Sequence, residues 1–289
     1  MSAKVSHIIF LHIPKAGGTT LRNVLYHQYS RRNIYEIGED VNGDIKHFKG
    51  LAESKRKKIK LLSGHMSHGL HIYLPGRSLY LTMLRDPVKR VYSEYRFLSS
   101  NTLHPLYAIV SKLTFREYLH VNPTRQANNG QTRLLSGNSF DDQTGIPGII
   151  PLGRNDLEKA LKNLKVYFPT IGLLERFDET LLLWRCQLGW RPPFYEKKNI
   201  TARSSEPLDD ADVAYVRELN RYDLILYDMA VTYFNENLRQ QPESFKKQLS
   251  LFRVMNQVYR RLVICRRTGK QKWVSAKIRF KNRRLQARS

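Results

Sequence analysis

Short aliphatic runs alternate along the chain with segments in which apolar residues recur every three or four positions. The runs are typical of buried parallel strands, and the segments between them are typical of amphipathic helices. The strands predicted in this way cover residues 7–13, 58–63, 78–85 and 166–174, and the helices cover residues 20–29, 87–97, 180–188, 209–220 and 224–238. The alternation predicts an α/β fold in which helices flank a central parallel sheet.

Local signals mark several helix ends. Asp86 is a good N-cap, and Pro87 suits the first turn of the helix that follows. Asn155 can cap a further helix with leucines along one face, and Gly189 stops the helix over 180–188. The helix start at Asp86 is therefore well signalled.

Basic residues are concentrated at the carboxyl end of the chain. The 289 residues include 49 Lys+Arg and 25 Asp+Glu, a formal charge of +24. Residues 246–289 contain 15 of the basic residues and no Asp or Glu, which leaves a charge of +9 for residues 1–245. This shift in composition divides the sequence into a domain, residues 1–245, and a basic tail, residues 246–289.

The tail carries apolar residues at helical spacing, namely Leu249, Phe252, Met255, Tyr259 and Leu262. A basic amphipathic helix can lie on an anionic membrane, guide acidic glycans inward, or pack on the domain with its outer face solvated. All three interpretations remain open from the sequence.

The compartment is predicted from what the sequence lacks. No stretch approaches the ~18 apolar residues that cross a bilayer, and the first residues do not resemble a secretory signal. Cys186 and Cys265 lie far apart, without the spacing of a disulfide framework or a zinc site. We therefore expect a cytoplasmic protein, with peripheral contact at the inner membrane face as an option for the tail.

A loop over residues 12–20, His-Ile-Pro-Lys-Ala-Gly-Gly-Thr-Thr, stands between the first predicted strand and its helix. Such junctions bind anions, because unpaired N–H groups and the positive end of the helix dipole converge there. Gly17 and Gly18 allow the backbone to approach a phosphate, and the hydroxyls of Thr19 and Thr20 can donate hydrogen bonds. Lys15 precedes the glycines instead of following them, which disfavours a Walker-type kinase or ATPase.

A second motif, Arg-Asp-Pro-Val-Lys-Arg-Val-Tyr-Ser-Glu-Tyr over residues 85–95, begins at the end of a predicted strand. Arg85 can grip a phosphate with its guanidinium fork, and Ser93 follows after slightly more than two helical turns. The plain alternative is a salt bridge for Arg85 and a helical serine without function. Arg90 and Tyr92 are interpreted as surface or packing positions.

Together the two motifs resemble the sulfotransferase family 2, in particular its carbohydrate branch with the heparan sulfate 2-O and 6-O enzymes. The resemblance implies a P-loop-like three-layer fold with 3′-phosphoadenosine 5′-phosphosulfate (PAPS) as sulfuryl donor, PAP as product, and no metal. It also implies that Lys15 and the amides of residues 16–20 hold the 5′-phosphosulfate, while Arg85 and Ser93 hold the 3′-phosphate. Ala16 thus joins the predicted binding loop.

Three histidines follow a predicted strand, at residues 65, 68 and 71. A histidine suits the general-base role that transfer to a hydroxyl requires. His65 is the best candidate, since it follows the strand directly and its Gly-His-x-Ser segment resembles the family's catalytic segment. His68 and His71 compete for the role or contact substrate, and the bland alternative is a loop histidine. No acidic residue accompanies them, so a metal cluster is disfavoured.

Further segments resemble the family more loosely. Arg133, within residues 128–137, can hold an acidic substrate, whereas Arg176 can equally serve a structural pair with Asp178 or Glu179. Residues 197–203 resemble a loop that closes over the nucleotide.

The sequence thus predicts a PAPS-dependent sulfotransferase that acts on a carbohydrate or glycolipid, with Lys15 and His65 as catalytic residues. Tyrosine or small-alcohol acceptors remain open. The alternatives are a nucleic-acid-binding basic protein and a catalytically silent relative that binds a phosphorylated or sulfated ligand. The first is disfavoured because the chain has no recognisable nucleic-acid-binding module, so no specific nucleic acid partner is expected.

Overall fold

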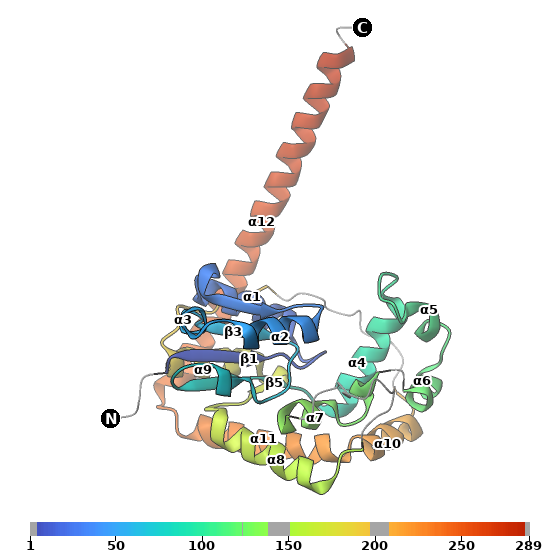
Figure 1. Cartoon of the computed structure of the whole chain (residues 1–289). Coiled ribbons are helices and arrows are strands. Elements are labelled where there is room, and N and C mark those ends of the chain that lie inside the picture. The colour runs from blue at the N-terminus through green and yellow to red at the C-terminus, as the bar shows by residue number, and fades with distance from the viewer. Residues whose placement is uncertain (1–4, 123, 138–150, 197–207, 287–289) are drawn as a thin grey trace.

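The computed structural model describes residues 5–122, 124–137, 151–196 and 208–286 (Figure 1). Its centre is a parallel sheet with the strand order β2-β3-β1-β4, and a pair of short parallel strands, β5 and β6, lies beyond β4 in the chain. The strands are β1 (His7–Leu11), β2 (Ile34–Ile37), β3 (Leu61–Gly64), β4 (Ser78–Leu81), β5 (Met83–Leu84) and β6 (Gly172–Leu173). Three of the four predicted strands are thereby found in the sheet.

Helices cover both faces of the sheet. Helix α1 (Gly18–Gln28) lies on one side, and α8 (Arg154–Tyr167) and α11 (Arg221–Arg239) lie on the other (Figure 1). The predicted three-layer α/β fold is confirmed. The remaining helices are α2 (Val41–Gly50), α3 (Glu53–Arg56), α4 (Pro87–Ser100), α5 (Tyr107–Val110), α6 (Phe115–Val121), α7 (Gly130–Ser136), α9 (Phe177–Leu188), α10 (Asp210–Leu219) and α12 (Ser244–Gln286).

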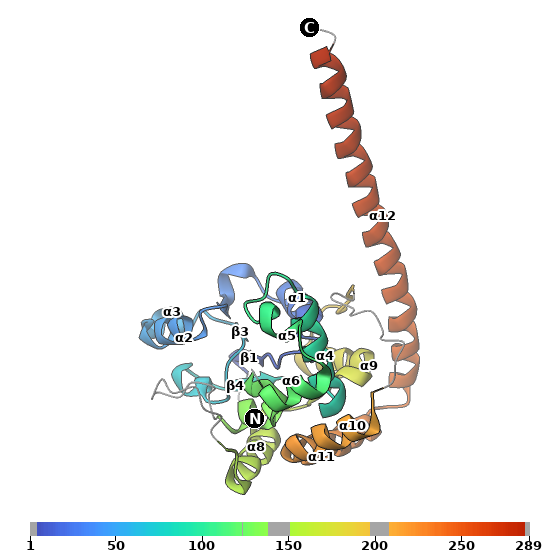
Figure 2. The same cartoon turned by 90° about the vertical axis from the view of Figure 1, so that its right-hand side faces the viewer.

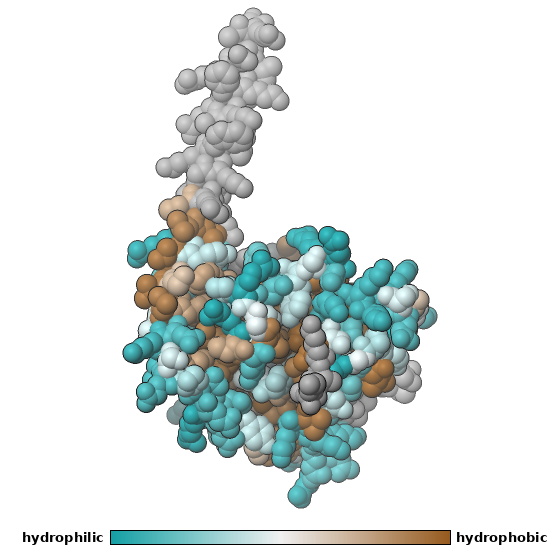
Figure 3. Space-filling view, turned by 90° about the vertical axis from the view of Figure 1, so that its left-hand side faces the viewer, coloured by the Kyte–Doolittle hydropathy of each residue, from teal (hydrophilic) through white to brown (hydrophobic). Residues whose placement is uncertain are grey.

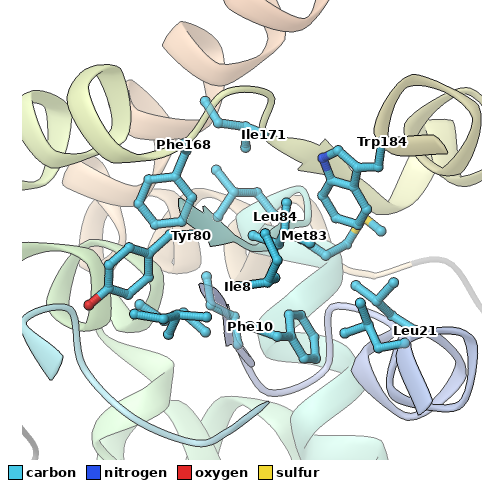
Figure 4. Close-up of a cluster of buried hydrophobic side chains, with 14 of the residues drawn as sticks. Ile8, Phe10, Leu21, Tyr80, Met83, Leu84, Phe168, Ile171 and Trp184 are labelled. Atoms are coloured by element: carbon cyan, nitrogen blue, oxygen red, sulfur yellow. The ribbon is translucent and has the colours of Figure 1, made fainter. Parts of the chain in front are cut away.

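The main core lies between the sheet and these helices. Figure 4 shows Phe10 of β1 and Leu84 of β5 close to Trp184 of α9 and Leu21 of α1, and each of these side chains is at most 1% exposed. A second, smaller core joins α4, α5, α6 and α10. Close packing of this kind gives the strand ends a rigid base from which loops can hold a ligand.

The predicted helix signals act as expected. The Asp86 carboxylate accepts the Lys89 N–H at 2.9 Å, and Pro87 is the first residue of α4. Gly189 ends α9 in the left-handed conformation, with φ at 65°. Asp209 caps α10 by accepting the Ala211 N–H.

Two predictions around residues 153–174 are wrong. Asn155 is not the N-cap of α8, because Gly153 takes that position and its N–H donates to Asp156 at 2.9 Å. The strand over 166–174 is reduced to β6, since α8 continues through Tyr167 with Leu164 fully buried. Pro169 then prevents the helix from continuing.

Helix α12 begins two residues before the predicted tail and leaves the body beside α9 (Figure 2). Its first turns pack on the domain: Phe252 stacks on Phe194 at 5.8 Å, and the Asn256 side chain accepts the Tyr195 N–H. Met255 and Leu262, which the sequence placed at the same helical spacing as Phe252, are 44% and 57% exposed. The division at residue 245 stays a prediction. Within the described part of the chain, no helix is long and apolar enough to cross a membrane.

Candidate functional site

The loop between β1 and α1 is a tight turn whose glycines are required by their surroundings. Lys15 and Gly17 both have positive φ, at 64° and 78°. A Cβ on Gly17 would stand 2.6 Å from Leu174, and one on Gly18 would overlap the imidazole of His12. No acidic residue lies in the first turn of α1, so no carboxylate competes there for the amides that could bind an anion.

Lys15 lies in a partly buried position against α4. Its Nζ is 3.8 Å from the centre of the Phe97 ring. Burial lowers the pKa of Lys15 to about 8, Glu94 opposes this shift, and Arg85 adds to it. The protein itself neutralises the positive charge of Lys15 only in part. An anion bound beside the ammonium group would supply the missing negative charge.

Arg85 joins the second motif to the loop. Its Nη1 donates to the carbonyl of Lys15 at 2.9 Å, so residues 70 positions apart meet at the carboxyl ends of neighbouring strands. Its backbone is held by Gln131, whose amide accepts the Arg85 N–H at 3.0 Å and donates to the Arg85 carbonyl at 2.9 Å. The structure thus brings Lys15 and Arg85 to one place, as the sequence predicted.

A buried network of charges lies behind this pair. Of the two options open for Arg90, surface or packing, the structure shows packing: the side chain is fully buried, 3.5 Å from the Glu94 carboxylate and 4.0 Å from that of Asp223. Asp223 also accepts the backbone N–H groups of Gln131 and Thr132 at the start of α7. Arg90 and Glu94 stand four residues apart on one helix, a spacing at which ion pairs form and which could have indicated this contact.

His65 follows β3 directly and lies beside the loop. Because Leu11 and Gly64 are paired in the sheet, the next residues, His12 and His65, come side by side. Their rings stack at 4.1 Å, and the His65 Nδ1 lies 3.0 Å from the His12 carbonyl oxygen. A carbonyl only accepts hydrogen bonds, so Nδ1 carries the proton and Nε2 keeps its lone pair.

The environment keeps the His65 ring neutral. Burial lowers its pKa, the hydrogen bond to His12 opposes the shift, and Arg22 adds to it. The side chain is nevertheless exposed at the surface. A neutral, accessible imidazole with a free lone pair on Nε2 has the properties of a general base.

His12 is the residue that the sequence analysis named within the motif without giving it a role. Its ring fills the space above Gly18 and stacks between Phe10, at 5.4 Å, and His65. Burial and the neighbouring His65, Arg22 and Lys15 hold its pKa well below the usual value. His12 therefore connects the phosphate loop with His65.

His68 and His71 lie in an aromatic cluster and not on the His12–His65 stack. His68 packs on Tyr80 at 4.6 Å, and His71 packs on Tyr167 at 4.5 Å. Burial and His71 lower the pKa of His68 to about 4. Their predicted role in substrate contact stays a prediction. Among the described residues, no group of His, Cys, Asp or Glu is arranged to hold a metal ion.

The remaining positions that the sequence singled out are Ser93, Arg133, Arg176 and the loop 197–203. Ser93 is half-buried on α4, and Arg133 is 1% exposed on α7. Their predicted roles stay predictions. Arg176 forms the structural pair with Glu179, through contacts of 2.6 and 2.8 Å. The predicted closing loop, 197–203, lies outside the described residues.

A hollow of about 130 Å³ opens beside the end of the loop. Its walls come from α1, from residues 194–196 and from α12, and they include Thr20, Asn23, His27, Tyr195 and Tyr259.

Comparisons with known proteins show which family the chain resembles. The family model described as "Sulfotransferase family" matches residues 1–144, which contain Lys15, His65 and Arg85. Human heparan-sulfate 6-O-sulfotransferase 1 is 28% identical over 84% of this chain and 67% of its own length. A protein-tyrosine sulfotransferase of Arabidopsis thaliana is 31% identical, over 38% of this chain and 21% of its own.

Mouse sulfotransferase SULT7A1 complexed with PAP is a weaker structural match. It is 13% identical over 75% of this chain and 63% of its own, with a TM-score of 0.38, too low to support an argument. The family match covers both motifs, and the human enzyme and its namesakes from Cricetulus griseus and Mus musculus each match 84% of the chain. The chain is a sulfotransferase family 2-like protein.

Proposed function

We propose that this protein transfers the sulfuryl group of PAPS to a hydroxyl of a carbohydrate or glycolipid, with His65 as the base. The observation that carries the proposal is the 2.9 Å contact between the Arg85 guanidinium and the Lys15 carbonyl. It brings the two anion-binding motifs to one site, where a single nucleotide with phosphates at both ends can engage them.

The residues of the loop fit the donor. When bound, PAPS supplies an activated sulfuryl group whose leaving group is a phosphate. The amides of residues 16–20 and the Lys15 ammonium group would hold the 5′-phosphosulfate, and Lys15 would stabilise the negative charge that develops on the leaving oxygen. Arg85 has five N–H donors, and with Ser93 it would hold the 3′-phosphate, which distinguishes PAPS from ATP.

His65 would accept the proton of the acceptor hydroxyl at Nε2. Its hydrogen bond from Nδ1 to the His12 carbonyl orients the ring and stabilises the positive charge that it gains. The acceptor oxygen would attack the sulfur on the side opposite to the leaving phosphate oxygen. Because the phosphate can leave without being protonated by a general acid, the reaction requires only this one proton transfer.

The acceptor class is supported by the relatives. The similarity to a heparan-sulfate sulfotransferase covers 84% of this chain, against 38% for the tyrosine sulfotransferase. We therefore favour a sugar hydroxyl. Transfer of labelled sulfate from PAPS to a desulfated glycosaminoglycan, a glycolipid and a tyrosine peptide tests this choice, and labelling of the peptide alone would show the acceptor class to be wrong.

Calorimetry with PAP tests the nucleotide site. Arg85→Ala should weaken PAP binding by about 10- to 100-fold, since a hydrogen bond to a charged group contributes about 1.5–3 kcal/mol. The control is Arg154→Ala, because Arg154 is exposed on α8, away from both motifs. Unchanged PAP affinity in Arg85→Ala would remove this residue from the site.

Thermal stabilisation separates the alternative functions. The unsubstituted protein should be stabilised by PAP more than by ATP, because ATP lacks the 3′-phosphate. Stabilisation by duplex DNA without any effect of PAP would favour the nucleic-acid-binding alternative. A protein that binds PAP but transfers no sulfate to any acceptor class would be a silent relative.

A further inference from the structure

Helix α12 has an exposed apolar stripe in addition to the face that packs on the body. Phe245 and Phe252 face inward and are about 95% buried. Turned away from them are five side chains that are 44–59% exposed, namely Leu251, Val254, Met255, Val258 and Leu262. Four of these follow one another at intervals of 4, 3 and 4 residues, which keeps them on one side of the helix.

This stripe differs from the isolated apolar residues found on any protein surface. Figure 3 shows hydrophobic side chains gathered along the foot of α12, where the helix leaves the body. A contiguous exposed apolar patch usually marks a surface that binds a partner. The 43-residue helix, roughly 65 Å long, presents the stripe beyond the sheet and its covering helices.

The positive charge of residues 246–289 limits the kinds of partner that the stripe can bind. Residues 246–289 contain 15 Lys+Arg and no acidic residue. Arg253 pairs with Asp178 of the body at 3.3 Å. A second copy of the helix would bring two strongly cationic segments together, which like-charge repulsion opposes.

A partner must therefore be anionic and also offer an apolar layer. Soluble polyanions such as nucleic acids and acidic polysaccharides neutralise the charge but leave the stripe in water. An anionic bilayer satisfies both features, since its headgroups attract the basic residues and its acyl boundary accepts apolar side chains.

We propose that α12 docks the protein on an anionic lipid surface, with the stripe 251–262 inserted at the boundary between headgroups and acyl chains. The helix lies in the plane of this surface and does not cross it. The proposal is independent of the sulfotransferase reaction.

Vesicle co-sedimentation tests the docking. The full chain should bind vesicles of phosphatidylcholine with added phosphatidylglycerol, and bind phosphatidylcholine alone much more weakly. A triple variant, Leu251→Gln, Val258→Gln and Leu262→Gln, should lose about 10- to 100-fold in partitioning, because each substitution removes apolar area from the inserted face. Its PAP affinity should equal that of the unsubstituted protein, which shows that the domain is folded.

The matched control removes exposed apolar residues from the body. Leu103→Gln, Val121→Gln and Val166→Gln replace side chains that are 92%, 55% and 60% exposed, and should leave partitioning unchanged. Equal vesicle binding by the stripe variant and the unsubstituted protein would overturn the proposal. So would binding to heparin or DNA without binding to vesicles, or a dimer that the stripe variant loses while neither protein binds vesicles.

Discussion

The His65 imidazole shows how a neighbouring backbone group can define the function of a side chain. The carbonyl of His12 holds the Nδ1 proton, and the His12 ring stacks on the imidazole. The His65 pKa is lowered as a result of its burial, so the base form persists below the usual histidine pKa of about 6.5. The acid limb of the pH–rate profile should therefore lie below pH ~6.5.

Substitution of His65 is the direct test of its role. His65→Ala should lose about 10²- to 10⁴-fold in turnover, the usual contribution of a general base, and should keep its PAP affinity. His71→Ala is the control, because His71 packs on Tyr167 away from the His12–His65 stack. Equal losses in both variants, measured by sulfate transfer, would contradict the assignment of the base to His65.

The lowered pKa of Lys15 predicts that nucleotide binding depends on pH. Its pKa is lowered to about 8 in the free protein, and a bound phosphate would raise it. Protonated Lys15 therefore binds better, so PAP affinity should be constant well below pH 8 and fall above it, by up to about tenfold per pH unit. Calorimetry from pH 6 to 9 checks this.

The control is Lys15→Arg, which keeps its charge over this range. Whatever its affinity at neutral pH, it should show no decrease above pH 8. The same decrease in Lys15→Arg would mean that another group titrates.

Most of these residues could be predicted from the sequence, but their partners could not. Lys15, Arg85 and His65 stand in short motifs whose chemistry is local. Gln131 gave no such signal, because its importance comes from a contact with Arg85 that only the folded chain makes. The helical spacing of Glu94 indicates its pairing with Arg90 but not its electrostatic effect on Lys15.

Helix α1 depends on the absence of a side chain at its start. A methyl group at residue 18 would overlap the His12 ring and push it away from both the loop and His65. Gly18→Ala should therefore lose at least about 100-fold in turnover, as happens when a catalytic group is misplaced by about 1 Å.

The matched control is Gly50→Ala at the end of α2, where no atom lies within 4 Å of the added group. Its activity should be unchanged and its stability should change by no more than about 0.5 kcal/mol. Full activity in Gly18→Ala, with an unchanged melting temperature, would contradict the close packing of His12 on the loop.

The capping signals at Asp86 and Gly189 predicted helix ends correctly and the one at Asn155 did not, while among the strands β2 was missed and the last was predicted too long. Asp86 and Gly189 act through their own backbone neighbours, so the ends that they mark agree with the structure. The apolar run after residue 166 suits a strand and a buried helix end equally, and packing against the body extended the helix. The half-exposed edge strand β2 has too few buried residues to form a recognisable pattern.

Helix α11 lies far from α4 and α7 in the sequence but contacts both in the folded protein. Asp223 accepts hydrogen bonds from the start of α7 and faces the buried Arg90, so residues 90, 131 and 223 form one unit. Asp223→Ala should destabilise the protein by about 3–5 kcal/mol, because it removes one of the two carboxylates that face the buried Arg90 and the acceptor of two buried backbone N–H groups.

Urea unfolding measures this loss. Asp228→Ala on the same helix is the control, since Asp228 is exposed, and it should change stability by less than about 0.5 kcal/mol. A similar small effect for Asp223→Ala would show that the buried network does not hold α7 and α11 together.

Local chemistry was enough to predict the phosphate loop, the Arg85 motif, the α/β class and the basic tail. Capping, turn and helical-phase signals act over a few residues, so they can be interpreted without the fold. Strand register brought His12 beside His65, and the packing of α7 brought Gln131 beside Arg85, across 53 and 46 residues. The fold also turned the stripe of α12 outward, because which side of a helix is buried depends on the surface that it meets.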